Sequence, residues 1–162
     1  MWAACRWREA PMTRDNAREI AVRLAYELSF TDKPVRELLD ERLTKEAFAS
    51  LAEEDPLYAD APGAKQSEYI RRVVEGVSAH AAELDADIER YAVGWKFSRI
   101  PLTASAVMRV AMYEALYMPE IPNAAAVNSA VNIAKKYETP ETVRFINGIL
   151  GSFVRQEAAP RS

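Results

Sequence analysis

Apolar positions along this chain recur every three or four residues, which is the spacing of one face of an α-helix. No segment alternates apolar and polar residues in the way that a half-buried strand does. Residues 54–64 contain two prolines and a glycine and predict a loop. The pattern therefore predicts an all-α bundle without an internal repeat, with helices over residues 13–30, 34–52, 67–88 and 103–117, one after Pro122, and one from Thr139 to about Phe153.

Several residues indicate where these helices begin, end or pack. Ser67 is predicted to cap the third helix, and Thr139, which precedes a proline, is predicted to cap the last. A break is expected near Asp85. Gly76 lies inside a helix, where glycine costs about 1 kcal/mol relative to alanine, so it predicts close packing against another element. Gly148 follows an asparagine, a pair typical of hairpins, but its flanks keep the helical period and predict a helix.

Composition narrows the class of protein. The 162 residues are 49% hydrophobic and 28% charged, which is the mix of a soluble globular chain, and the length predicts one domain. We expect this domain to span residues 13–155, between flexible tails at 1–12 and 156–162. The chain has no run of about 20 apolar residues, and its N-terminal stretch lacks the apolar core of a secretory signal. We therefore expect a cytoplasmic protein without membrane contact.

The chain has one cysteine, Cys5, and one histidine, His80. A single cysteine cannot form an internal disulfide, and one residue of each type cannot supply a His/Cys zinc cluster. They also leave few ways to build a Ser/His/Asp or Cys/His catalytic unit, and no glycine-rich phosphate loop is present. We expect no catalytic residue, no metal site and no cofactor.

Basic residues stand next to aromatic residues at three places along the chain. Such pairs hold single-stranded RNA because cations pair with phosphates while bases stack on rings. The net charge of −3 argues against a protein that coats nucleic acid by bulk charge, but it permits local basic patches. A second interpretation puts the rings in the core and the lysines beside the C-terminal end of a helix dipole. The three places are Arg14, Arg18 and Tyr26; Lys135, Lys136 and Tyr137; and Arg144 with Phe145, about one turn after Glu141.

An ordered series of motifs runs from about Arg14 to Phe153. Its segments are Ala17-Arg18-Glu19-x-Ala21-Val22-x-Leu24-x-Tyr26; Tyr69-x-Arg71-x-Val73-Val74-x-Gly76-Val77 followed by Leu84-Asp85-x-x-Ile88; Trp95 to Arg99 with Val107-Met108-Arg109-Val110-Ala111-x-Tyr113-Glu114; Ile121-Pro122 to Val127-Asn128-x-Ala130-Val131-x-x-Ala134-Lys135; and Phe145-Ile146-Asn147-Gly148-Ile149-Leu150. In their order and spacing these segments resemble the NusB family of transcription antitermination factors.

The resemblance implies a small all-helical bundle of two packed helical subdomains without catalytic activity. Members of this family bind the boxA element of nascent RNA as a heterodimer with NusE, a ribosomal protein of the small subunit. The heterodimer joins NusA and NusG on RNA polymerase and suppresses termination in ribosomal RNA operons. The resemblance thus predicts the same role and the same partners for this chain.

The resemblance also implies roles for single residues. Tyr26 matches a tyrosine of the family's first helix, and Tyr137 and Phe145 match aromatic residues near the RNA. Glu141 occupies a position that is acidic in related proteins. We expect Tyr26 and Phe145 to stack on bases, each stack contributing about 1–3 kcal/mol.

The predicted basic part of the RNA surface consists of Arg14, Arg18, Lys135, Lys136 and Arg144. Arg14 and Arg18 match part of the family's N-terminal arginine cluster. Together with the two lysines they are expected to position the RNA backbone. Binding by this chain alone should be weak and sensitive to salt, and the NusE partner should tighten it.

The chain departs from the family pattern at two places. Asp15 and Asn16 follow Arg14 where relatives often carry consecutive arginines, so the phosphate patch is thinner. Ser129 stands where the family usually has a glutamate.

Other functions remain open from the sequence. The same surface would serve a ribosomal RNA biogenesis chaperone, and the net acidity favours a protein-interaction bundle with weak RNA binding. A homodimer is also open, since a surface that meets a partner can self-associate. The helix over residues 103–117 is a candidate wall for a protein partner.

Overall fold

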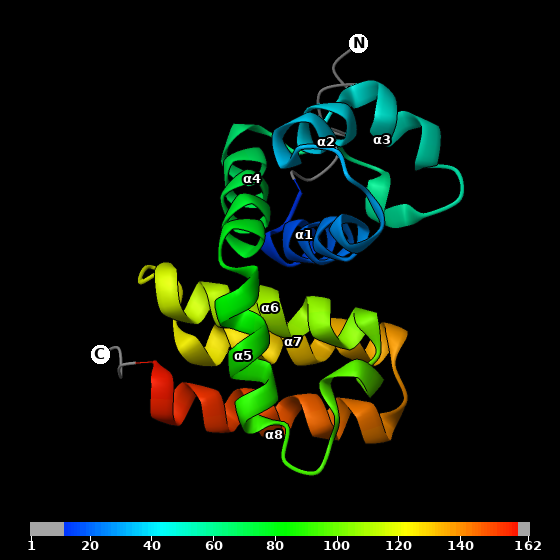
Figure 1. Cartoon of the computed structure of the whole chain (residues 1–162). Helices are drawn as coiled ribbons and strands as arrows, with labels where there is room; N and C mark the ends of the chain where they lie inside the picture. Colours follow the sequence, from blue (N-terminus) through cyan, green and yellow to red (C-terminus); the bar gives the residue numbers. More distant parts are fainter. Residues whose placement is uncertain (1–11, 159–162) are drawn as a thin grey trace.

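The computed structural model describes residues 12–158, and these form an all-α bundle without strands (Figure 1). Thr13 begins the first helix, because its side chain accepts a hydrogen bond from the backbone N–H of Asn16. The helices are α1 (Arg14–Glu27), α2 (Val35–Arg42), α3 (Lys45–Leu51), α4 (Ala64–Ala79), α5 (Ala81–Tyr91), α6 (Leu102–Tyr117), α7 (Asn123–Tyr137) and α8 (Pro140–Glu157), with short 3-10 turns η2 (Leu28–Phe30), η3 (Pro56–Tyr58) and η4 (Phe97–Arg99).

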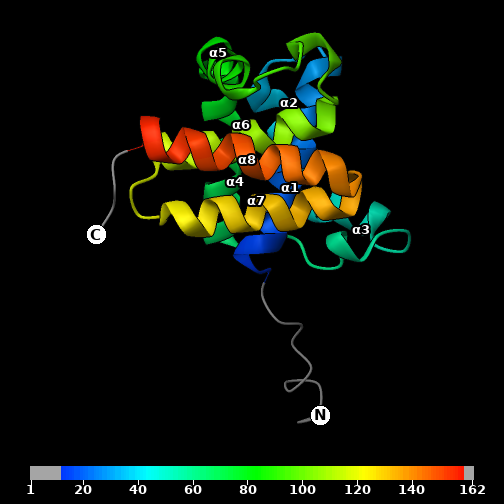
Figure 2. The same cartoon turned by 90° about the horizontal axis from the view of Figure 1, so that it is seen from below.

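The helices form two packed groups that share one hydrophobic core. In Figure 1, α1 to α4 occupy the upper half and α5 to α8 the lower half, and α4 leads directly into α5. Seen from below in Figure 2, α7 and α8 lie side by side. This arrangement confirms the predicted all-α bundle of two helical parts.

Helix α6 lies at the centre of the bundle, where α1, α4, α5, α7 and α8 all pack against it. Most of its residues are buried, from Ala104 to Ala115. A helix that is apolar on all sides belongs in the core rather than on a surface. The hypothesis that residues 103–117 form a wall for a protein partner is therefore corrected.

Several predicted helix boundaries also differ from the structure. The single helix expected over residues 34–52 is divided, because the Thr44 side chain accepts a hydrogen bond from Ala47 N–H and starts α3 anew. Ser67 does not cap α4, which begins at Ala64 with Gly63 at the N-cap. The break expected near Asp85 lies at His80, between α4 and α5. The predicted cap at Thr139 is confirmed by its hydrogen bond from Thr142 N–H.

Two glycines behave differently within their helices. At Gly76 on α4, a Cβ atom would overlap the ring of Tyr113 on α6, which confirms the predicted close approach. At Gly148 on α8, a Cβ atom would meet nothing within 4 Å. The helix continues through Gly148 as predicted.

The described ends of the domain extend beyond the predicted boundaries. Met12 is buried in the core, and α8 continues to Glu157, followed by the buried Ala158. The Glu157 carboxylate accepts hydrogen bonds from Arg90 Nη1 at 2.5 Å and from the Tyr91 hydroxyl at 2.6 Å, both on α5. Met12 and residues 156–158 are thus part of the bundle, which corrects these parts of the tails expected at 1–12 and 156–162, while residues 1–11 and 159–162 lie outside the described residues.

Within residues 12–158, no helix is both long and apolar enough to cross a membrane. In the same range, no three His, Cys, Asp or Glu side chains come together in a way that would hold a metal ion.

Candidate nucleic-acid interface

A pocket of about 470 Å³ lies beside the C-terminal half of α1. Four aromatic rings line it: Tyr26 near the end of α1, Phe30 on η2, Tyr58 on η3, and Tyr137 at the end of α7. The Tyr26 and Phe30 rings are 5.0 Å apart between centroids. The exposed fractions of Tyr26, Phe30 and Tyr137 are 38%, 62% and 39%, so these rings are open to solvent. The interpretation of Tyr26 as a core residue is not supported.

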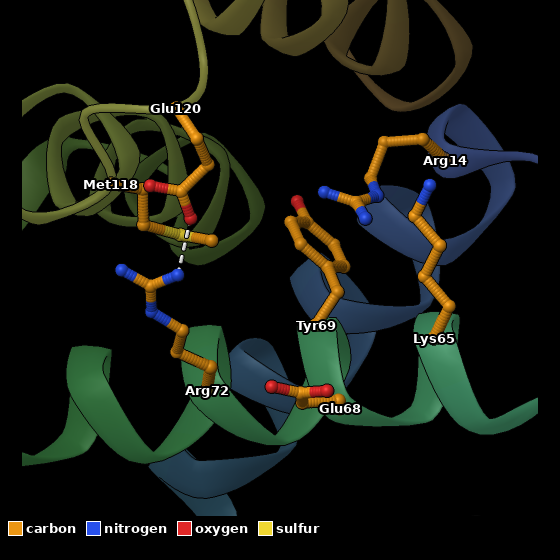
Figure 3. A pocket seen from close by; sticks show the side chains of 7 residues that line it. All are labelled: Arg14, Lys65, Glu68, Tyr69, Arg72, Met118 and Glu120. Atoms are coloured by element: carbon orange, nitrogen blue, oxygen red, sulfur yellow. Dashed lines mark hydrogen bonds and ion pairs between the residues drawn. The ribbon is translucent and has the colours of Figure 1, made fainter.

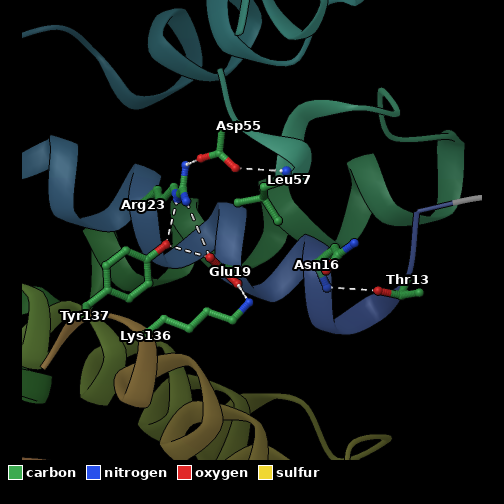
Figure 4. Close-up of polar contacts among 8 residues, drawn as sticks. All are labelled: Thr13, Asn16, Glu19, Arg23, Asp55, Leu57, Lys136 and Tyr137. Carbon is green, nitrogen blue, oxygen red and sulfur yellow. Dashed lines mark hydrogen bonds and ion pairs between the residues drawn. The ribbon is translucent and has the colours of Figure 1, made fainter. Parts of the chain in front are cut away.

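The Tyr137 hydroxyl lies at the centre of a polar network between α1 and α7 (Figure 4). It donates a hydrogen bond to Glu19 Oε2 at 2.6 Å and accepts one from Arg23 Nε at 2.9 Å. Lys136 Nζ donates to the other oxygen of the same carboxylate at 2.6 Å. Glu19 is buried, and burial together with this carboxylate raises the pKa of Tyr137 to about 12. Tyr137 and Lys136 are therefore held in place by α1.

Arg23 connects this network to the segment after α3. Its Nη1 donates to Asp55 Oδ2 at 2.6 Å, and its guanidinium carbon lies 5.4 Å from the ring centroid of Tyr58 and 5.7 Å from that of Tyr137. Burial alone lowers the pKa of Arg23, but hydrogen bonds to Asp55 and the two tyrosines raise it overall. The backbone N–H of Leu57, and then Arg23, lower the pKa of Asp55. Arg23 is thus a fully charged guanidinium at the edge of the aromatic pocket.

A groove of about 460 Å³ lies on the other side of Arg23. It is lined by Asn16, Arg23 and Lys136 together with the carboxylate residues Glu19 and Asp55. The cations along this groove already have carboxylate partners, so a phosphate group would have to compete with Glu19 and Asp55 for them.

Arg18 lies in the interior, 4% exposed. Its Nε donates to Oε1 of the fully buried Glu114 at 2.9 Å, and the same oxygen accepts a hydrogen bond from the Tyr69 hydroxyl. Burial by itself lowers the pKa of Arg18, and pairing with Glu114 raises it overall. A guanidinium without solvent access cannot contact the RNA backbone. The phosphate contact expected for Arg18 is therefore corrected: Arg18 pairs with Glu114 inside the bundle and has a structural role.

Arg14 faces a different pocket, of about 200 Å³, between α1 and α4 (Figure 3). Its guanidinium lies 4.1 Å from the centroid of the Tyr69 ring, and its Nε donates to Gln66 Oε1 at 2.9 Å. Lys65 and Arg72 line the same pocket. Arg14 therefore does not line the aromatic pocket at Tyr26.

Asp15 and Ser129, which differ from the family pattern, are in contact with each other. Asp15 Oδ1 accepts hydrogen bonds from Ser129 Oγ on α7 and from Arg18 Nη1, both at 3.0 Å. Asp15 and Ser129 thus connect α1 and α7 at the position where the arginine cluster was expected.

The third predicted group lies at the start of α8. Phe145 is half-buried, and its ring centroid is 4.4 Å from that of Trp95 in the segment between α5 and α6. Glu141 and Arg144 are exposed on the same helix, and Lys135 is exposed near the end of α7.

A model of the NusB family matches residues 15–155 of the chain. The chain belongs to the NusB family. The transcription antitermination protein NusB of Thermoanaerobacter sp. is 37% identical over 146 residues, which are 90% of this chain and 93% of that protein. The corresponding protein of Acetivibrio thermocellus is 38% identical over 144 residues, 89% of this chain and 90% of its own length. Membership in this family places the chain among transcription antitermination factors and not among enzymes.

Solved NusB structures have the same fold. T. maritima NusB superposes with a TM-score of 0.77 at 25% identity, over 93% of this chain and 96% of that one. A chain from a crystal structure of the antitermination factors NusB and NusE in complex with dsRNA superposes with a TM-score of 0.67 at 20% identity, over 88% of this chain and 96% of its own.

The NusB fold brings together only some of the predicted residues. Tyr26 and Tyr137 meet in one pocket with Lys136 beside it, and Arg144 and Phe145 are neighbours on α8. Sequence reasoning missed Arg23, Tyr58 and Asp55. Arg23 lies one turn before Tyr26, which is a signal that could have been used. Tyr58 and Asp55 lie in the segment predicted as a loop, and no periodicity there indicated which helix they approach.

Proposed function

We propose that this NusB-family protein is an RNA-binding transcription antitermination factor that binds boxA RNA together with NusE and suppresses termination in ribosomal RNA operons. The observation that carries the proposal is the open aromatic pocket formed by Tyr26, Phe30, Tyr58 and Tyr137, with the charged Arg23 at its edge. Family membership supports the role, and the fold shared with a chain of a solved complex of NusB and NusE with dsRNA supports the partners.

The pocket suits a base that has left its stack. Aromatic side chains hold unpaired bases by stacking, and every base has a face that can stack. The Tyr26 and Phe30 rings are the most direct candidates, because both side chains are exposed and their centroids lie 5.0 Å apart. Arg23 would contribute cation–π and phosphate contacts from the rim of the pocket.

Weak binding by the isolated protein follows from the charges around the pocket. Lys136 and Arg23 are already paired with Glu19 and Asp55, so phosphate contacts would replace existing ion pairs. Lys135 and Arg144 are exposed and form no ion pair in the described range, so they would add to the electrostatic part of the binding. NusE would then supply further RNA surface and tighten the complex, which itself would join NusA, NusG and RNA polymerase in the cytoplasm.

The proposal is tested by the anisotropy of a labelled boxA-like RNA, titrated with the protein alone and with NusE. Tyr26→Ala should weaken binding by about 5- to 100-fold, which corresponds to the loss of one base stack. Tyr26→Phe keeps the ring and should bind nearly as tightly as the wild type. Leu51→Ala, which shortens an exposed apolar side chain outside the pocket, is the matched control. Unchanged binding by both Tyr26→Ala and Tyr137→Ala would remove the pocket from the proposal.

A transcription assay separates antitermination from the alternative role as a ribosomal RNA biogenesis chaperone. A template with a terminator downstream of boxA should give more read-through when the protein and NusE are added. RNA binding without a gain in read-through would favour the chaperone. If the protein binds no RNA with or without NusE, the result would favour the second alternative, a helical bundle that acts through protein interactions.

A further inference from the structure

The segment between α5 and α6 presents an exposed tryptophan on a fixed backbone. Gly94 adopts a φ of +84°, a left-handed conformation that reverses the chain. Trp95 N–H then donates to Ala92 O at 3.1 Å. Ala92 and Ile100 are buried and Phe97 packs against the core, which anchors the segment from the inside.

The remaining side chains of this segment face solvent. Trp95 is 40% exposed, and Lys96 and Arg99 are also exposed. A backbone hydrogen bond of 2.9 Å from Arg99 N–H to Lys96 O closes the turn between them. Two cations thus follow the tryptophan, Lys96 just before η4 and Arg99 at its end.

The Trp95 ring lies against Phe145 of α8, with 4.4 Å between ring centroids and an angle of 37° between their planes. Arg144, the neighbour of Phe145, is exposed. We call the surface formed by Trp95, Lys96, Arg99, Arg144 and Phe145 the tryptophan patch. In Figure 1 the segment between α5 and α6 crosses in front of α8.

The cations of the tryptophan patch differ from most arginines of the described chain. Arg23, Arg72 and Arg90 each have a carboxylate oxygen within ion-pair distance. In residues 12–158, the side chains of Lys96, Arg99 and Arg144 form no ion pair. The patch thus carries three positive groups, and the exposed Glu141 lies beside it, one turn before Phe145. Surfaces that bind single-stranded nucleic acid combine exposed cations, which pair with phosphates, and accessible aromatic rings, on which bases stack. The tryptophan patch has both.

We infer that the tryptophan patch is a second RNA-contacting surface, in which Trp95 stacks on a base and Lys96, Arg99 and Arg144 pair with phosphates. The inference rests on the proposed RNA-binding function but concerns residues outside the aromatic pocket. Tyr137 ends α7 and Phe145 lies in the second turn of α8, so the short α7–α8 connection separates the two surfaces. One RNA strand of about 12 nucleotides, within the usual range of single-strand sites, would contact both.

The intrinsic fluorescence of Trp95 tests the inference directly. The chain has three tryptophans, Trp2, Trp7 and Trp95, so the double substitution Trp2→Phe and Trp7→Phe leaves Trp95 as the only indole. Titration of this variant with a boxA-like 12-nucleotide RNA in the presence of NusE should quench and saturate the Trp95 emission at the same concentration at which the anisotropy of the labelled RNA saturates. In the otherwise wild-type chain, Trp95→Ala should weaken RNA binding by about 5- to 100-fold, while Trp95→Phe should restore most of the affinity.

Matched variants separate stacking from charge and from folding. Val93→Ala removes an 87% exposed apolar side chain from the same segment and should leave RNA binding unchanged. Arg99→Ala should reduce the slope of log affinity against log salt by about 0.7, the value for one phosphate contact on a single strand. Thermal unfolding of Trp95→Ala checks that the bundle remains folded.

The outcomes distinguish this inference from the proposed function. If the RNA binds with the same affinity to Trp95→Ala, with Tyr26→Ala still defective, the tryptophan patch is not an RNA surface and the proposed function stands. If NusE alone quenches Trp95 and RNA adds nothing, the patch is a protein-binding surface and the inference is overturned. If no RNA binds even with NusE, both fail together.

Discussion

The hydroxyl of Tyr137 on α7 donates a 2.6 Å hydrogen bond to the carboxylate of Glu19, which is buried on α1. This bond fixes a ring of the aromatic pocket to the helix that carries Tyr26. The ring and the hydroxyl of Tyr137 therefore have separate roles, one at the pocket and one in holding α1 and α7 together.

Tyr137→Phe should separate these two roles. The variant loses a hydrogen bond to a charged group, and we expect the free energy of unfolding to fall by about 1–2 kcal/mol. The ring remains, so RNA affinity in the presence of NusE should change less than threefold. Urea denaturation and RNA anisotropy measure the two effects. A large loss of affinity with unchanged stability would mean that the hydroxyl itself contacts RNA.

Arg18→Ala should destabilise the bundle. The substitution leaves the fully buried Glu114 without its guanidinium partner, and breaking a buried ion pair from one side costs about 3–5 kcal/mol. Denaturant unfolding should show this loss as a lower midpoint.

Arg144→Ala is the matched control for Arg18→Ala, because it removes an exposed arginine instead of a buried one. It should leave the unfolding midpoint unchanged and reduce the salt dependence of RNA binding, because Arg144 is exposed and forms no ion pair in the described range. A stable Arg18→Ala protein with a reduced salt slope would contradict the structural role of Arg18.

Gly76→Ala should destabilise the protein although alanine is the better helix former. A Cβ atom at this position overlaps the Tyr113 ring, which is itself confined by the Tyr117 ring at 5.1 Å between centroids. Overpacking of this kind costs about 1–3 kcal/mol. Gly148→Ala is the matched control, because its Cβ meets nothing and the helix should gain up to about 1 kcal/mol. Thermal unfolding should therefore shift in opposite directions for the two variants.

The ion pair between Asp55 and Arg23 should make part of the stability depend on pH. The pKa of Asp55 is lowered from its ordinary value of 3.8, first by Leu57 N–H and then by Arg23. A carboxyl with a lowered folded pKa stabilises the protein above its unfolded pKa and loses this effect as pH falls through the folded value. The stability difference between wild type and Asp55→Asn should be constant from pH 7 to about 5, should shrink as the pH falls through 3.8, and should disappear only below the lowered pKa of Asp55 in the folded protein. A difference that persists at pH 2 would exclude ionisation of Asp55 as its cause.

The fold was largely predictable from the sequence because helices are local. Hydrophobic periodicity placed most of the helices, and the Thr139 cap depends on residues only three positions apart. The division between α2 and α3 was missed because the apolar stripe continues across Thr44, where one side-chain cap outweighs the pattern. Gly76 indicated a close approach, but only the structure identified Tyr113 as the group that approaches it.

The types of residue that form the candidate site were predictable from the sequence, but the positions of these residues in the fold were predictable only in part. The sequence by itself determined that arginines and aromatic residues alternate along amphipathic helices, and Tyr26 is on the open face as expected. Only the tertiary structure decided that Arg18 is buried against Glu114, 96 positions away, and that Trp95 lies against Phe145. The physical reason is that helix periodicity states which residues share a face but not what packs against it. The burial and charge pairing of a side chain depend on helices that are distant in the sequence, and these two properties decide whether an arginine holds the fold or remains available to bind RNA.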